Sequence, residues 1–195
     1  MRNIQLFGKD TSTEILGNRE KPILTISDCE NVRITGIAFR HTGEAGQPPS
    51  PVVRIRDSRN VELDLCFVSG SMKQAGIEII GASRVFLNAL HSVYNRIGLS
   101  IDSLLPVEVS ECTFKQNSQY GIEVGASSQA VTLVHNRCKW NGNVGIIYRG
   151  IGKAVIENND CRENSYYGIV IEKKGSEIKL MHNPSKAGRV YWRRL

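Results

Sequence analysis

Three acidic side chains and one arginine are the best candidates for acid–base chemistry in this sequence: Glu78, Asp102, Glu123 and Arg149. A pair of carboxylates can cleave a glycosidic bond as general acid and base, and several carboxylates together can hold a calcium ion. We therefore regard these four residues as candidate catalytic groups of a polysaccharide lyase or hydrolase. The alternative, which we favour, is that they are alternating surface charges that keep an exposed sheet from pairing with other chains.

A second set of residues suits ligand binding rather than catalysis. It combines aromatic rings with cations and consists of Tyr94, Lys115, Lys139, Trp140, Arg162 and Tyr166. Flat aromatic surfaces can stack on sugar rings or on protein side chains, and the adjacent cations favour uronates or acidic peptides. The alternative is that Trp140 and Tyr166 merely cover the backbone of turns.

No motif of a known catalytic type accompanies either set. The sequence contains no adjacent pair of Asp residues, no Gly-His-Gly and no Asp-Pro-His-Asp. Its five cysteines are an odd number without Cys-x-x-Cys spacing, so we expect buried free thiols rather than disulfides or a zinc site. We expect no cofactor, and calcium would be needed only under the lyase alternative.

The composition is that of a globular protein, because 41% of the 195 residues are hydrophobic and 23% are charged. The formal charge of +6 lies mostly in residues 185–195, which carry four cations and no acid and leave +2 for residues 1–184. We therefore expect no nucleic-acid partner, since such binding usually needs a basic face. No apolar run approaches the roughly 18 to 20 residues of a membrane span, so we expect no membrane contact. The absence of a signal-peptide pattern and the five unpaired cysteines slightly favour a cytoplasmic location.

Internal repetition predicts the elements that would position these residues. Glycine recurs at Gly76, Gly98, Gly121, Gly145 and Gly168, at spacings of 22, 23, 24 and 23 residues. Each glycine opens a short segment of alternating apolar and polar residues, and two further short apolar segments follow it. Three short strands per unit, each burying one face, account for this pattern. The units are too short for helix pairs, and their Val, Ile, Gly and Asn content favours strands joined by tight turns.

The economical arrangement of such units is a parallel β-helix, an all-β solenoid of about seven coils with about 22 to 24 residues per coil. Equivalent residues of successive coils would stack at about 4.8 Å and give a rod of roughly 35 Å. This stacking predicts one buried column that contains Val107, Val131, Ala154 and Ile178.

The same stacking limits what the candidate residues can do together. Glu78 and Glu123 would lie two coils apart, and so would His135 and His182. A separation of roughly 10 Å is loose for a pair of catalytic carboxylates and too long for a shared metal ion. The other two histidines are scattered, so we predict no metal site.

Two columns of asparagine are expected at the turns of the solenoid. One contains Asn136, Asn159 and Asn183, and the other contains Asn95, Asn117, Asn141 and Asn164. Asparagine tolerates the left-handed corner conformation and can bond to the coils on either side, so both columns predict internal asparagine ladders.

The repeat pattern resembles a known family. The segments G-I-x-[IV], V-x-[LI], N-x-C or C-x-F, and N-x-x-Y-G are similar to the right-handed parallel β-helix repeats of pectate-lyase-like proteins, which include the carbohydrate-binding and sugar-hydrolase domain. The resemblance covers about residues 20–183. It implies the right-handed fold, but it leaves the function open, because the family includes pectate lyases, polygalacturonases and non-enzymatic domains.

The two ends and one insertion complete the predicted organisation. We divide the chain into a β-helix domain at residues 1–184 and a basic tail at residues 185–195. The stretch Gly43 to Pro51 is an insertion, which would be either a wall of a groove or a tolerated surface loop. No capping helix is expected before Ile4, so the chain is either one module of a longer protein or exposes an end to a partner, including another copy. The apolar residues of the tail could cover the far end.

Together these observations favour a non-enzymatic β-helix module that binds carbohydrate, especially an acidic polysaccharide, or a protein partner. The alternative is a lyase or glycoside hydrolase that acts on an acidic polysaccharide. Because the cations and aromatic residues are more suggestive than the carboxylates, we expect the ligand on the face of Lys115, Lys139 and Trp140.

Overall fold

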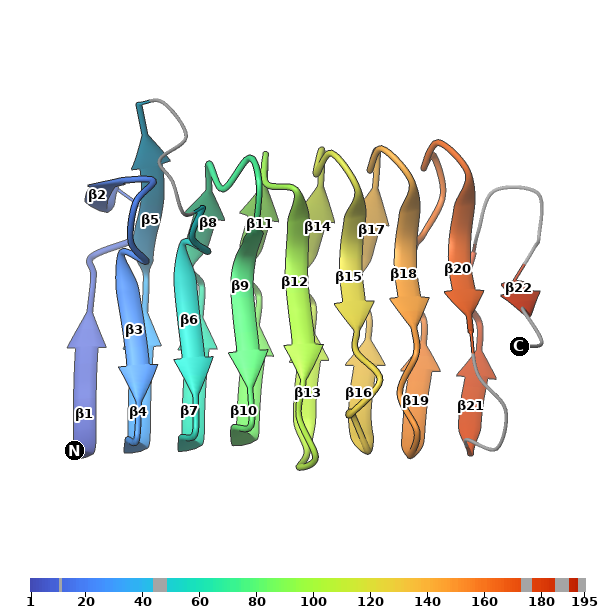
Figure 1. Ribbon diagram of the computed structural model, residues 1–195, viewed down its shortest axis with the longest axis horizontal. Helices are drawn as coiled ribbons and strands as arrows, with labels where there is room; N and C mark the ends of the chain where they lie inside the picture. The colour runs from blue at the N-terminus through green and yellow to red at the C-terminus, as the bar shows by residue number, and fades with distance from the viewer. Residues whose placement is uncertain (11, 44–48, 173–176, 185–189, 193–195) are drawn as a thin grey trace.

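The chain forms a rod of stacked coils, in which each full coil contributes one strand to each of three parallel sheets (Figure 1). This computed structural model describes residues 1–10, 12–43, 49–172, 177–184 and 190–192. All strand pairs within this part of the chain are parallel, and every sheet joins strands of successive coils. The predicted all-β solenoid of about seven coils is therefore confirmed.

Sheet A contains the second strand of most repeat units and has eight strands. In spatial order these are β1 (Arg2–Phe7), β4 (Glu30–Thr35), β7 (Arg59–Asp64), β10 (Ser83–Asn88), β13 (Val107–Ser110), β16 (Ala130–Val134), β19 (Lys153–Glu157) and β21 (Ile178–Met181).

Sheet B contains the short third strands and has six members. These are β2 (Thr13–Asn18), β5 (Ile37–Thr42), β8 (Phe67–Ser69), β11 (His91–Val93), β14 (Thr113–Lys115) and β17 (Arg137–Lys139).

Sheet C contains the strands that the repeated glycines open, and it has eight members. These are β3 (Leu24–Ser27), β6 (Val53–Arg56), β9 (Ala75–Ile80), β12 (Ile97–Asp102), β15 (Tyr120–Val124), β18 (Val144–Tyr148), β20 (Tyr167–Ile171) and β22 (Val190–Trp192).

The main core is an apolar column enclosed by the three sheets, because alternate residues of each strand point inward. A second, smaller cluster on sheet C consists of the buried residues Val144, Ile147 and Val170. The predicted column in sheet A is confirmed: Val107 pairs with Val131, Val131 with Ala154, and Ala154 with Ile178. The first three are buried, and Ile178 near the end of the rod is half-buried.

The cysteines belong to this interior. Cys66, Cys112, Cys138 and Cys161 are buried and Cys29 is half-buried, and all five are free thiols. Burial raises the pKa of Cys112 to about 12 and raises that of Cys138 as well, where the adjacent Cys161 adds to the effect. These thiols pack as small apolar groups.

Both predicted asparagine ladders are present. The backbone N–H of Asn117 donates to Oδ1 of Asn141 (3.1 Å), and the N–H of Asn141 donates to Oδ1 of Asn164 (2.9 Å). In the other ladder the N–H of Asn136 donates to Oδ1 of Asn159 (3.0 Å), and the N–H of Asn159 to Oδ1 of Asn183 (2.9 Å).

The expectation that the ladder asparagines themselves adopt the left-handed conformation is wrong. The residues with positive φ are the ones just before them, such as Trp140 (φ 54°) before Asn141 and His135 (φ 56°) before Asn136. The left-handed residue turns the chain and points its own side chain outward, while the following asparagine points its amide inward, where it bonds to the neighbouring coil.

The ladder explains the repeated glycines. A Cβ placed on Gly121 would lie 2.5 Å from the carbonyl oxygen of Gly145 and 3.0 Å from the Asn141 amide nitrogen. Gly98 and Gly145 meet equivalent atoms of their own neighbours. Because the ladder amide and the next coil occupy the space of a side chain, the five strands of sheet C from β9 to β20 carry a glycine at their second residue.

At the far end of the rod, the last strand extends the solenoid beyond residue 184. Tyr191 of β22 pairs with Val170 of β20, and its ring stacks on that of Tyr167 at 5.0 Å between centroids. Residues 44–48 of the predicted insertion and residues 185–189 and 193–195 of the tail lie outside the described residues.

Candidate ligand-binding site

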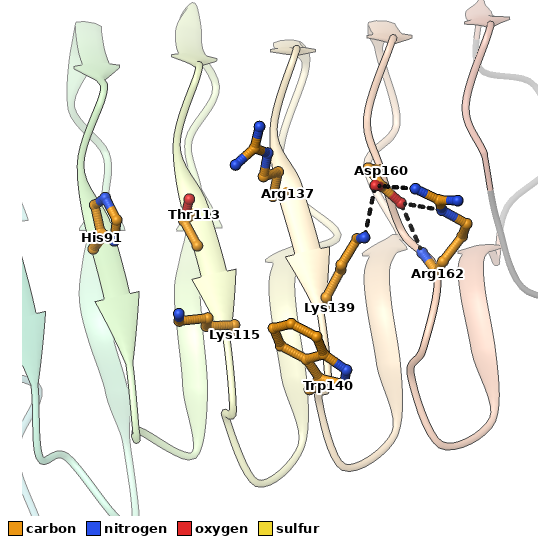
Figure 2. A pocket seen from close by; sticks show the side chains of 8 residues that line it. All are labelled: His91, Thr113, Lys115, Arg137, Lys139, Trp140, Asp160 and Arg162. Carbon is orange, nitrogen blue, oxygen red and sulfur yellow. Dashed lines mark hydrogen bonds and ion pairs between the residues drawn. The ribbon is translucent and has the colours of Figure 1, made fainter.

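A hollow of about 470 Å³ lies on the outer face of sheet B (Figure 2). We call it the sheet B hollow. Eight residues line it: His91, Thr113, Lys115, Arg137, Lys139, Trp140, Asp160 and Arg162. They come from β11, β14, β17 and the segment that follows β19, so four consecutive coils build the site.

The strand register aligns these side chains in two rows. His91 pairs with Thr113, Thr113 with Arg137, and Arg137 with Asp160 through an isolated bridge. Lys115 pairs with Lys139 in the second row. The residues between the rows, Ser92, Phe114 and Cys138, are fully buried, which forces the residues on either side of them outward. The sheet therefore repeats the outward groups once per coil.

Trp140 stands at the rim of the hollow because it occupies the corner between sheets B and C. Its left-handed backbone turns the side chain away from the core and leaves 54% of the residue exposed. Tyr94 occupies the equivalent corner two coils earlier and is 58% exposed, and Tyr166 is 70% exposed. Trp140 and Tyr166 thus both present more than half of their surface to solvent.

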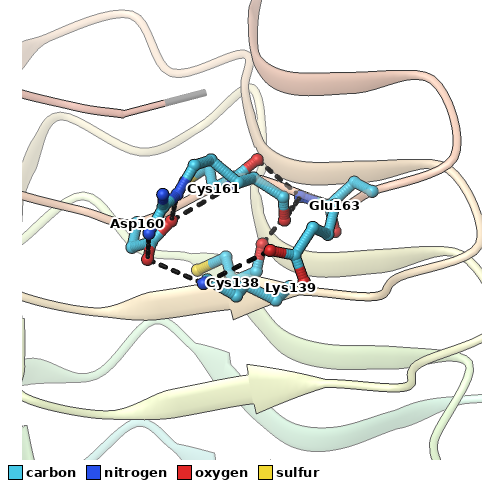
Figure 3. Close-up of polar contacts among 7 residues, drawn as sticks. Cys138, Lys139, Asp160, Cys161 and Glu163 are labelled. Atoms are coloured by element: carbon cyan, nitrogen blue, oxygen red, sulfur yellow. Dashed lines mark hydrogen bonds and ion pairs between the residues drawn. The ribbon is translucent and has the colours of Figure 1, made fainter. Parts of the chain in front are cut away.

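One carboxylate, that of Asp160, binds two of the cations (Figure 2), and Figure 3 shows it beside Lys139. Asp160 accepts hydrogen bonds from Nε (to Oδ1, 2.9 Å) and Nη2 (to Oδ2, 2.8 Å) of Arg162, and Lys139 Nζ lies 2.8 Å from the same Oδ2. The bonds from Arg162, followed by those from Lys139, hold the pKa of Asp160 well below its usual range despite partial burial. Lys139 also lies 3.8 Å from Glu163. Both cations are therefore largely neutralised within the protein.

Lys115 and Arg137 differ, because neither has an ion pair or hydrogen-bonded side-chain partner among the described residues. Four cations against one carboxylate give the hollow a formal charge of +3. Burial lowers the pKa of His91, and the charges of Lys115 and Arg137 lower it further. The hollow is thus an electropositive surface with two cations ready to bind an anion.

The sequence predicted half of this lining. Lys115, Lys139, Trp140 and Arg162 line the hollow as one surface, whereas Tyr94 and Tyr166 lie outside its lining. Sequence reasoning missed His91, Thr113, Arg137 and Asp160. The sequence did contain a signal for three of them. His91, Thr113 and Arg137 stand two positions before Val93, Lys115 and Lys139, and residues two positions apart lie on the same face of a strand.

The four candidate catalytic residues lie on sheet C, but they do not form one cluster. Glu78 accepts a 2.6 Å hydrogen bond from Arg54 in the preceding coil. Asp102 accepts a 3.1 Å bond from the backbone N–H of Ser127, which fixes a turn.

Arg149 lies between Glu123 and Glu172 and is ion-paired with both, with its Nε 2.7 Å from Glu172. Burial opposes the charge on Arg149, but the bonds to Glu172 and Glu123 outweigh it and raise the Arg149 pKa. The carboxylates of sheet C are thus bound to arginines or to backbone of their own sheet. This arrangement suits a stable outer face better than proton transfer to a substrate.

Other site types find little support in the described part of the chain. No group of three or more His, Cys, Asp or Glu residues is arranged there to hold a metal ion. His135 and His182 stand two coils apart, at equivalent corners. No helix long and apolar enough to cross a membrane occurs among the described residues.

The sequence matches the family described as the right-handed β-helix region over residues 53–191. The match covers more than half of the chain, so the protein belongs to the right-handed β-helix family. No protein with a curated description matches the sequence significantly.

Two solved structures share the fold. The A-module of a mannuronan C-5 epimerase from Azotobacter vinelandii superposes with a TM-score of 0.57 at 13% identity, covering 87% of this chain and 64% of that one. A surface protein and adhesin from Streptococcus pneumoniae superposes with a TM-score of 0.55 at 12% identity, covering 100% of this chain and 65% of that one. The chain therefore spans slightly less than two thirds of either structure. At such low identity the likeness concerns the fold alone.

Proposed function

We propose that this protein is a non-enzymatic β-helix module that binds an acidic polysaccharide in the sheet B hollow. The observation that carries the proposal is the pair of unpartnered cations, Lys115 and Arg137, beside the exposed indole of Trp140. Cations can bind the carboxylates of uronate sugars through charge-assisted hydrogen bonds, and the indole offers a flat face for a sugar ring.

The hollow suits a glycan better than an acidic peptide. An extended peptide gains much of its affinity by adding a strand to a free sheet edge. The strands β11 and β14 are hydrogen-bonded on both sides, so the hollow offers side chains and no free backbone edge. An acidic sugar polymer can be bound by cations, a hydroxyl group and a flat aromatic surface, and the hollow presents Lys115 and Arg137, Thr113 and Trp140.

The enzymatic alternative has less support, although the fold admits it. Two of the similar structures are a mannuronan epimerase and an adhesin, so an enzyme and a binding protein both occur on this architecture. On sheet C, Glu78 and Glu123 are engaged by Arg54 and Arg149 and Asp102 by the backbone of Ser127. The one acid that lines the hollow, Asp160, is held ionised by Arg162 and Lys139. Neither place offers a free carboxylate to transfer a proton.

Titration calorimetry with a galacturonate trimer tests the proposal. We expect binding that weakens as salt rises, because exposed cations are screened. Trp140→Ala should weaken binding about tenfold, since stacking contributes about 1.4 kcal/mol. Lys115→Ala should weaken binding more than Lys139→Ala, whose charge is already neutralised by Asp160. Phe86→Ala and Lys153→Ala, an exposed aromatic residue and an exposed cation on sheet A, are matched controls that should leave affinity unchanged.

The Asp160→Asn variant should change the affinity for the trimer in the opposite direction, which makes the test more stringent. This substitution releases Lys139 and Arg162 and raises the charge of the hollow by one, so affinity for the trimer should increase several-fold. No binding by the wild type, or equal binding by the Trp140→Ala variant in its folded state, would refute the proposal. Binding of an acidic peptide in place of the uronate would favour a protein partner, and the appearance of unsaturated products or new reducing ends would favour the enzyme.

A further inference from the structure

His91 is the first member of the row of outward side chains that crosses the sheet B hollow. The row continues in register with Thr113 of the next coil and with Arg137 of the coil after that. His91 and Arg137 therefore stand two coils apart, at roughly 10 Å, with one uncharged hydroxyl group between them. Figure 2 shows the Lys115 side chain extending from the coil of Thr113 toward that of His91. An anion that contacts Lys115 and Arg137 would thus have His91 as its third neighbour.

Both nitrogens of the His91 ring are free to bond to a ligand. No hydrogen bond or ion pair involves this ring within the part of the chain that the structure describes. The ring stacks on Phe67 of the preceding coil, at 6.3 Å between centroids and 21° between the planes. Because Phe67 covers the ring on the side of the earlier coils, the opposite side faces Thr113 and the hollow.

The charged groups on the side of the earlier coils compensate one another around His91. Arg40 of β5 is ion-paired with Glu14 of β2 at 2.6 Å. Lys9 and Asp10, which precede β2, line a smaller hollow that His91 also lines, and their charges are opposite. These elements therefore bring no net charge to the ring.

Three further titratable groups near the row contribute little. Cys66 lines the smaller hollow and stays a neutral thiol, because burial raises its pKa. Glu111 occupies the corner of the next coil, where its side chain is exposed and water screens its charge. Asp160, at the far end of the row, is engaged by its own two cations.

Two cations therefore decide the charge state of His91 in the empty hollow. Burial disfavours the charged ring, and the charges of Lys115 and Arg137 disfavour it further, so the pKa of His91 lies below its usual value. At neutral pH the ring is therefore uncharged. A carboxylate bound among the cations has the opposite effect, because a nearby anion favours the charged form.

We propose that His91 takes up a proton from the solvent when an anionic ligand enters the sheet B hollow and then contacts the ligand as a third cation, so that the site binds acidic polysaccharide more tightly as the pH falls. This inference rests on the proposed function and adds a regulation to it. The coupling is reciprocal. The factor by which the ligand favours the protonated ring is also the factor by which the protonated ring favours the ligand.

The size of the effect follows from the groups that titrate between about pH 5.5 and pH 8. Carboxylates ionise at about pH 3 to 4, and lysine and arginine keep their charge far above pH 8, so His91 is the lining residue whose charge changes in this window. Each unit by which the ligand raises the pKa of His91 corresponds to a tenfold gain in affinity. Because the ring is partly exposed to water, we expect a gain of about fivefold between pH 8 and pH 5.5.

Titration calorimetry with the galacturonate trimer at these two pH values, at constant ionic strength, tests the inference. The wild type should bind about fivefold more tightly at the lower pH. The His91→Gln variant should lose this dependence, because an amide cannot take up the proton. His182→Gln is the matched control, since His182 is an exposed histidine outside the lining of the hollow, and it should keep the dependence of the wild type.

Proton NMR of the histidine rings gives a second, direct measurement. Addition of the trimer should raise the pKa of His91 by about half a unit to one unit and leave that of His182 unchanged. Without ligand, Lys115→Ala should also raise the pKa of His91, because it removes one of the two opposing charges.

The outcomes separate this inference from the proposed function. If the trimer binds the wild type equally at both pH values, or if His91→Gln keeps the full pH dependence, the role of His91 is refuted and the anion site stands. A pKa of His91 that the bound trimer leaves unchanged refutes it as well. If the trimer binds the wild type at neither pH, both proposals fall.

Discussion

Replacing Asn141 by Leu would remove the centre of the ladder between sheets B and C. Its side-chain oxygen accepts bonds from the backbone N–H of Asn117 and from Nδ2 of Asn117, both at 3.1 Å. Its own Nδ2 donates to the carbonyl of Phe114 (3.1 Å) and to Oδ1 of Asn164 (3.0 Å). All four bonds lie in the buried interior, where water cannot replace the lost partner.

The magnitude follows from the groups that the substitution leaves unpaired. Leucine has the same number and branching of side-chain heavy atoms as asparagine, but it is bulkier and has no polar atom. The N–H of Asn117 would lose its bond in the ladder, and one hydrogen of the Asn117 amide would lose its partner while the other keeps Ser92. A buried donor without a partner costs about 1 to 3 kcal/mol. Two such donors predict a loss of about 3 kcal/mol in the free energy of unfolding.

Urea unfolding followed by circular dichroism measures this loss as a lower midpoint at unchanged slope. Asn88→Leu is the matched control, because Asn88 also makes two side-chain bonds, to Asp64 (2.9 Å) and Ser110 (3.0 Å), but lies half-buried on the outer face of sheet A. Water can solvate the groups that this variant releases, so its loss should stay below about 1 kcal/mol. Equal losses in the two variants would refute the view that burial makes the ladder stabilising.

Three further predictions follow from the interior. Burial lowers the pKa of His41, so protonation favours the unfolded state. The free energy of unfolding should therefore fall as the pH drops below about 6.5. In a pH series of urea titrations, His41→Gln should lessen this fall, whereas the exposed His135→Asn should not. Gly121→Ala should lower the free energy of unfolding by about 1 to 3 kcal/mol, because the new methyl group meets the backbone of the next coil; an unchanged urea midpoint would contradict the packing argument. A thiol reagent should label at most Cys29 in the folded protein and all five cysteines after unfolding, and rapid labelling of Cys112 in the native state would show that the column is open.

The fold could be predicted because the solenoid repeats its physical constraints once per coil. Inward positions need apolar residues of similar size, and the ladder positions need an amide, so both recur at the spacing of one coil. The corner conformation was harder to assign, because the left-handed residue and the ladder residue are adjacent, and asparagine suits either role. The hydrogen bonds of the structure show that Asn141 points inward, and its backbone angles show that Trp140 is the residue with positive φ.

The site could be predicted only in part, because its electrostatics depend on contacts between coils. Stacking alone placed Lys115 beside Lys139. It did not reveal that Asp160 binds Lys139 and Arg162 together, since this aspartate lies outside the named strands and reaches across to the neighbouring coil. The pairing of Arg149 with Glu123 is diagonal for the same reason, and a search along columns cannot detect it.

The corner residues give an independent reason to assign a role to the sheet B face. A left-handed backbone costs a residue other than glycine about 1 kcal/mol, and least for asparagine and aspartate. This chain uses those residues at many of its other corners: Asn3, Asn31 and Asn60 in one column, and Asp28 and Asp57 in another. At the corner beside the sheet B hollow it uses Tyr94, Gln116, Trp140 and Glu163 instead, and the two aromatic residues are more than half exposed. Large rings at this position neither relieve the backbone nor fill the core, which supports the proposal that they contact a ligand. Strained residues cluster at binding sites, and here they stand beside cations that lack partners.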